Sequence, residues 1–82
     1  MKQTIAWIKA QDIREARIYN GDIYVSLQQD DTACRDSVYK IDRRRKSVEP
    51  VNYITYKFGT NGTNGIYRKS NPVDIERLKS IL

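Results

Sequence analysis

The chain has 82 residues, of which 39% are hydrophobic and 30% are charged, and it carries a net charge of +5. We expect one domain spanning residues 1–82, because two cores made from so short a chain would be too small to be stable. The longest apolar run covers only residues 5–8, whereas a membrane-spanning helix needs about 20 residues, so the sequence excludes such a helix.

The first ten residues fit two patterns, because their apolar side chains match both a strand alternation and a helical period. We expect a strand there, since the hairpin that follows leaves little room for a helix. In that hairpin, Asn20 and Gly21 separate two alternating apolar runs, and both residues tolerate the positive φ of a type I′ turn. The pattern therefore predicts paired strands over Arg14–Tyr19 and Asp22–Leu27.

The two strands of this hairpin should divide their side chains between two faces of a sheet, because successive residues of a strand alternate. The apolar face is predicted to carry Ala16, Ile18, Ile23, Val25 and Leu27. The opposite face is predicted to carry Arg17, Tyr19 and Tyr24. We therefore expect the hydrophobic core to lie on the first of these two faces.

A polar, acid-rich segment at residues 28–36 follows, and we expect it to be a loop. Val38–Ile41 is predicted as the next strand, and Asp42–Ser47 as the segment that reverses the chain. In this register Lys40 faces Glu49 across the two strands, and such an opposite-charge pair stabilises an antiparallel ladder. The segment 38–51 is therefore predicted to form a second hairpin.

The region after this hairpin is predicted to contain two more strands. Pro50, in the second strand of the hairpin just described, lacks an N–H group, so that strand should lie at a sheet edge or at a bulge. Val51–Phe58 alternates with large residues on both sides, which predicts a strand that is covered on both faces or binds a partner with one. Residues 59–65, GTNGTNG, are typical of a connecting turn, and Ile66–Lys69 is expected to be a short returning strand.

The last segment is predicted to be an amphipathic helix. Asn71 suits the N-cap, Pro72 the first helical position and Asp74 the third. One apolar stripe at helical spacing contains Ile75, Leu78, Ile81 and Leu82. We therefore expect an α+β fold that is mainly β: an antiparallel meander of five to six strands, as a small barrel or a single sheet, with a C-terminal amphipathic helix.

The composition argues against an enzyme and against a metal centre. The chain has no histidine, which removes the usual general base at neutral pH and the commonest transition-metal ligand. Cys34 lies among Asp30, Asp31 and Asp36, whose charge disfavours a reactive thiolate, and these aspartates lack the spacing of a calcium loop. We expect no catalytic residue, no metal and no cofactor. The enzymatic alternative is a histidine-free nuclease or toxin that uses arginine and tyrosine.

Positive charge is concentrated in the second half of the chain. Residues 1–39 carry five cations and six anions, whereas residues 40–82 carry ten cations and four anions. Arg43–Lys46 places four consecutive cations at the predicted tip of the second hairpin, and basic and aromatic residues adjoin one another in the neighbouring segments. The candidate binding residues are Lys40, Arg43, Arg44, Arg45, Lys46, Tyr53, Tyr56, Lys57, Tyr67, Arg68 and Lys69.

Arginine offers a planar fork of donors that matches phosphate oxygens, and tyrosine rings can stack on bases. We therefore expect a small, basic, non-enzymatic protein that contacts the phosphate backbone of nucleic acid without reading its sequence. The alternatives are a solvated turn without a partner and a protein-binding inhibitor or adaptor of the phage or plasmid type, acting through a Tyr/Arg-rich surface. A single cysteine and the absence of a recognisable signal peptide favour a cytoplasmic location.

Overall fold

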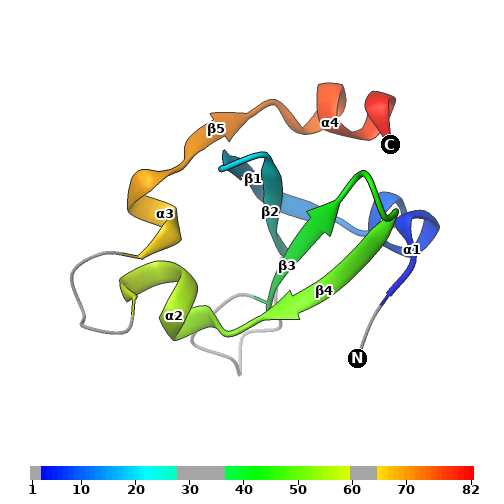
Figure 1. The fold of residues 1–82 in the computed structure, drawn as a ribbon. Coiled ribbons are helices and arrows are strands. Elements are labelled where there is room, and N and C mark those ends of the chain that lie inside the picture. Colours follow the sequence, from blue (N-terminus) through cyan, green and yellow to red (C-terminus); the bar gives the residue numbers. More distant parts are fainter. Residues whose placement is uncertain (1–2, 28–36, 60–64) are drawn as a thin grey trace.

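The computed structural model describes residues 3–27, 37–59 and 65–82 (Figure 1). The described strands are β1 (Ile13–Tyr19), β2 (Asp22–Leu27), β3 (Ser37–Asp42), β4 (Ser47–Val51) and β5 (Asn71–Val73). The described helices are α1 (Ile5–Lys9), α2 (Tyr53–Phe58), α3 (Ile66–Lys69) and α4 (Ile75–Ile81). The predicted loop at 28–36, with Cys34 and its neighbouring aspartates, and the centre of the predicted turn at 59–65 lie outside the described residues.

The strands form one open antiparallel sheet with the order β4-β3-β2-β1-β5. The first four strands are a meander, and the segment containing α2 and α3 then leads from one edge of the sheet to β5 at the other edge (Figure 1). The predicted α+β fold, mainly β and with a C-terminal helix, is confirmed. Of the two arrangements that the sequence leaves open, the structure has the single sheet.

Both predicted hairpins are present in the predicted registers. Asn20 and Gly21 have φ values of 53° and 85°, as a type I′ turn requires, and they join β1 to β2. In the second hairpin, Lys40 faces Glu49 across β3 and β4. Pro50 lies in β4, which is an edge strand, so its missing N–H leaves no ladder hydrogen bond unmade.

The main hydrophobic core lies between one face of the sheet and the helices α1 and α4. Its fully or nearly fully buried members are Ile8, Ile13, Ala16, Ile23, Val25, Leu27, Ile41, Val48 and Leu78. The apolar face predicted for the first hairpin is therefore confirmed. On the opposite face, α2 and α3 cover a smaller cluster around Tyr24, Val38 and Tyr56.

The predicted N-terminal strand is wrong, because Ile5–Lys9 form the helix α1. Thr4 caps this helix: its Oγ1 accepts a hydrogen bond of 3.0 Å from the backbone N–H of Trp7. Ile8 is completely buried against the sheet. The helix needs only five residues and ends before the hairpin begins, so the space between the N-terminus and β1 is sufficient for it.

The strands predicted over Val51–Phe58 and Ile66–Lys69 are also wrong, because most of the first segment and all of the second are helical. The Asn52 side chain accepts a 3.0 Å hydrogen bond from the Thr55 N–H and so caps α2, and Gly59, with φ 77°, ends it. These terminal signals outweigh the alternation of large side chains between them. The second segment forms the short helix α3, which begins directly after Gly65.

The C-terminal helix is confirmed, but it begins later than the sequence predicts. Asp74 is its N-cap, and its carboxylate accepts a 3.0 Å hydrogen bond from the Arg77 N–H. Asn71 and Pro72, predicted as the cap and the first helical position, instead lie in β5, where Pro72 faces Arg17 of β1. Of the predicted apolar stripe only Leu78 is fully buried, and Ile81 is 50% exposed.

Candidate binding site at the turn between β3 and β4

The turn between β3 and β4 has a backbone that one aspartate fixes. Asp42 Oδ1 accepts hydrogen bonds from the backbone N–H groups of Arg44, at 3.0 Å, and Arg45, at 3.3 Å. Lys46 adopts a left-handed conformation, with φ 52°, and leads into β4. The turn therefore has a defined shape, and the cations around it are attached to an ordered backbone.

All four cations of this turn are exposed to solvent. Among the described residues, their only ion pair joins Arg45 Nε to Asp42 Oδ2 at 3.9 Å, with the Arg45 side chain 85% exposed. Such an exposed pair contributes little, because water screens it. We call residues 43–46 the basic turn.

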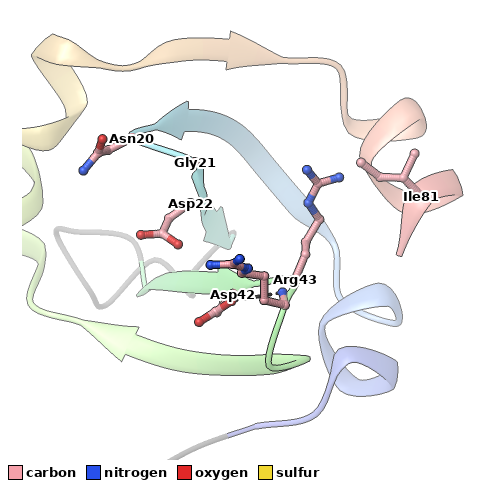
Figure 2. Close-up of a pocket in the computed structure, with 7 residues that line it drawn as sticks. Asn20, Gly21, Asp22, Asp42, Arg43 and Ile81 are labelled. Carbon is pink, nitrogen blue, oxygen red and sulfur yellow. Dashed lines mark hydrogen bonds between the residues drawn. The ribbon is translucent and has the colours of Figure 1, made fainter.

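An open depression of about 590 Å³ lies beside the basic turn, between it and the turn of the first hairpin (Figure 2). Its lining residues are Asn20, Gly21, Asp22, Asp42, Arg43, Arg44 and Ile81. A smaller depression of about 310 Å³ adjoins it, since it shares Arg43 and Ile81 and is completed by Ile5, Lys46 and Leu82. The basic turn is thus bordered by polar groups of the first hairpin and by apolar side chains of α1 and α4.

Lys40 lies next to the basic turn but in a mixed electrostatic environment. It lines a hollow of about 160 Å³ together with Asp42, Arg45, Ser47 and Glu49. Two of these neighbours are acidic, and Glu49 is directly opposite Lys40 in the ladder. The positive charge of Lys40 is therefore partly offset by these two acids.

The tyrosines of the predicted site do not surround the basic turn. Tyr56 is 2% exposed, and its ring lies 5.6 Å from that of Tyr24 and 5.9 Å from that of Tyr67. Its hydroxyl is buried without a hydrogen-bond partner among the described residues. Burial is the main cause that raises the pKa of Tyr56 to about 12, and the charge of Glu15 adds to it. Tyr56 is thus a core residue with no free ring face for a base.

Tyr67 has two cations over its ring. Lys57 Nζ lies 3.7 Å from the ring centroid and Arg17 Cζ lies 4.6 Å from it. Arg17 also donates hydrogen bonds to Ser70, from Nε to Oγ at 2.6 Å and from Nη2 to the backbone oxygen at 2.8 Å. These contacts join α2, α3 and β1, so the arginine and the cation–π pairs stabilise the fold on this face.

The predicted site residues therefore form two separate groups. The basic turn lies at one end of β4, Lys40 faces the middle of this strand at Glu49, and the α2–α3 residues follow the other end of the strand (Figure 1). A strand of five residues is roughly 17 Å long. The second group comprises Tyr53, Tyr56, Lys57, Tyr67, Arg68 and Lys69. Within it, Arg68 and Lys69 are exposed, and Tyr53 packs edge-to-face on Phe58 with a centroid distance of 6.5 Å.

Four lining residues of the depression come from other parts of the chain and were missing from the predicted site: Asn20, Gly21, Asp22 and Ile81. The sequence contains no signal for them, because they come from the first hairpin and the last helix and meet only in the folded chain. In the part of the chain that the structure describes, no group of His, Cys, Asp or Glu could hold a metal ion. None of the described helices has the length and apolar character needed to cross a membrane.

Comparison of the chain with protein-family models, with curated proteins and with solved structures finds no match.

Proposed function

We propose that this protein is a non-enzymatic, cytoplasmic nucleic-acid-binding protein whose basic turn contacts phosphates without reading sequence. The observation that carries the proposal is the presence of four consecutive, solvent-exposed cations on a turn that Asp42 holds in shape. Contacts to phosphate need charge and reach, and they position a protein without base-specific geometry.

The shape of the turn supports this proposal energetically. Consecutive residues of a tight turn point in different directions, so two or three of the four side chains can reach one backbone at the same time. Because the backbone is already ordered in the free protein, binding costs mainly the ordering of the side chains. Arginine forks also make stronger, bidentate hydrogen bonds to phosphate than a lysine point charge.

The absence of catalysis is part of the proposal. The histidine-free alternative requires arginines and tyrosines to converge on one phosphate. The residues of the right type are Arg43–Arg45, in the basic turn, and Tyr53, Tyr56 and Arg68, in the α2–α3 group, so they fall into the two separate groups. Tyr56 is also buried, with a raised pKa, which keeps its hydroxyl protonated at neutral pH.

The test compares two variants of equal charge. One replaces all four residues of the basic turn with alanine, and the control replaces Lys9, Arg14, Arg77 and Lys79, which lie outside the candidate binding residues. Affinity for unrelated duplex sequences is measured by fluorescence anisotropy at about 50 mM salt. We expect the first variant to lose about tenfold or more on every sequence, and the control to lose clearly less. Equal losses would mean that net charge, and not this turn, causes binding.

A second candidate function is a protein-binding inhibitor or adaptor of the phage or plasmid type. The observation that favours it is an exposed apolar pair on α2: Ile54 and Phe58 lie one turn apart and are 45% and 46% exposed. Apolar and aromatic side chains of this kind anchor protein interfaces. The test is a pull-down from nuclease-treated lysate with the wild type and with the double variant Ile54→Ser, Phe58→Ser. A protein that only the wild type retains would favour this second function.

A further inference from the structure

The depression beside the basic turn combines three kinds of surface. Arg43 and Arg44 contribute cations from the second hairpin, and Asn20 and Asp22 contribute an amide and a carboxylate from the first (Figure 2). Ile81 adds an apolar wall from α4 and is half exposed. At about 590 Å³ the space lies within the range of ligand pockets, about 300–1,000 Å³.

The two carboxylates of this depression differ in what they can still bind. Asp42 is occupied by the backbone N–H groups of Arg44 and Arg45. Among the described residues, by contrast, the Asp22 side chain has no hydrogen bond or ion pair. It is therefore an acceptor available to a ligand, located within the same depression as two arginines.

We propose that this depression takes one unstacked base of a single-stranded nucleic acid while the basic turn binds the adjoining phosphates. The inference deepens the proposed function and depends on it. A nucleotide presents an anion, a flat apolar face and amino or carbonyl groups, and the depression offers the complement of each. Arginine guanidinium planes are common stacking partners for splayed bases.

The geometry favours single strands over duplex. In a duplex the base edges are paired and the flat faces are stacked, so only phosphates would reach the basic turn and the depression would stay empty. A single strand can turn one base into the depression at little cost, because that base is neither paired nor firmly stacked. The protein should therefore bind single strands more tightly than duplex of equal length.

The free carboxylate also gives a direction to base preference. A carboxylate accepts a hydrogen bond from the exocyclic amine of cytosine, whereas thymine and uracil present a carbonyl oxygen at that position. Asp22 should therefore favour cytosine over thymine or uracil. An asparagine at this position can donate as well as accept, so Asp22→Asn should abolish the preference.

The experiment measures binding of oligo-dC, oligo-dT and a mixed duplex, each of about 15 nucleotides, together with oligo-rC and oligo-rU. The proteins are the wild type, Asp22→Asn and the control Asp12→Asn, which removes one exposed acid outside the depression. We expect the wild type and the control to prefer single strands to duplex, and dC to dT, by about fivefold each. We expect Asp22→Asn to bind dC and dT equally.

Each other outcome decides against the inference. Equal or tighter binding to duplex, no difference between dC and dT, or a difference that persists in Asp22→Asn would overturn the base-binding depression and leave phosphate binding by the basic turn intact. Failure of the wild type to bind any oligonucleotide would overturn the proposed function and this inference together. The ribonucleotide pair shows whether the same depression accepts RNA.

Discussion

The buried hydroxyl of Tyr56 leads to a prediction about stability at high pH. The pKa of Tyr56 is raised to about 12 in the folded protein, against 10.0 for a free tyrosine, mainly by burial. Below pH 10 both the folded and the unfolded chain keep the proton. Between pH 10 and pH 12 the unfolded chain loses it while the folded chain retains it, so stability must fall as the pH rises.

The magnitude follows from the size of this shift. One pKa unit corresponds to about 1.4 kcal/mol, so the free energy of unfolding should fall by roughly 1 kcal/mol by pH 11 and by roughly 2 kcal/mol by pH 12. In the variant Tyr56→Phe this loss should be absent. Urea unfolding of both proteins, followed by circular dichroism at pH 9, 10, 11 and 12, measures the difference.

The comparison with Tyr56→Phe isolates the contribution of this one residue. The pKa of Tyr24 is also raised, mainly by burial and then by the charge of Asp22, but that residue is present in both proteins and its effect cancels. Below pH 9 the variant should be as stable as the wild type or more so, because it removes a buried hydroxyl that has no hydrogen-bond partner among the described residues. Parallel pH profiles for the two proteins would refute the burial of this hydroxyl.

Three further predictions concern packing and turn geometry, and each is measured by urea unfolding. Gly65→Ala should lower the free energy of unfolding by about 1–3 kcal/mol, because the added methyl group would overlap with the backbone of Lys57. Unchanged stability would contradict the close approach of Gly65 to that backbone. Gly21→Val should cost on the order of 1 kcal/mol or more from its φ of 85° alone, since the space around it is open; unchanged stability would argue against the type I′ turn. Leu78→Ala should lower the free energy of unfolding by about 2–5 kcal/mol and Ile81→Ala by much less, because Leu78 is fully buried and Ile81 is half exposed. Equal losses for the two variants would show that α4 packs on the sheet in a different orientation.

The parts of the fold that the sequence predicts correctly are those with short-range chemical signals. Asn20 and Gly21 permit only a few turn types, and the opposite charges of Lys40 and Glu49 indicate the register of the second hairpin. The sheet and its apolar face follow from these two hairpins. The C-terminal helix follows from its stripe, although the N-cap at Asp74 competes with an equally suitable Asn71.

The prediction fails where alternation and helical signals overlap. Val51–Phe58 alternates like a strand, yet Asn52 and Gly59 terminate a helix between them, and these two signals were available in the sequence. For the short α1 the sequence does not distinguish a helix from a strand, because five residues make less than two helical turns and show too little periodicity. Its place is decided by tertiary packing of Ile8 on the sheet.

The candidate site is predictable only where it is contiguous in the chain. The basic turn is visible in the sequence as four adjacent cations, and the structure places all four on the surface. The tyrosines have the right composition for stacking, but burial assigns Tyr56 to the core and two cations lie over the ring of Tyr67. The depression beside the turn brings together segments that are distant in sequence, so no local pattern could indicate it.

The salt dependence of binding shows whether the basic turn contacts phosphate. Phosphate contacts release counterions, so log affinity falls linearly with log salt, with a slope of about −0.9 per contact on duplex DNA. If two or three residues of the basic turn contact phosphate, replacing Arg43, Arg44, Arg45 and Lys46 with alanine should flatten this slope by about 2–3 units. We expect micromolar binding by the wild type at about 50 mM salt together with this change in slope. No binding under these conditions, or the same slope for both proteins, would contradict phosphate contact by the basic turn.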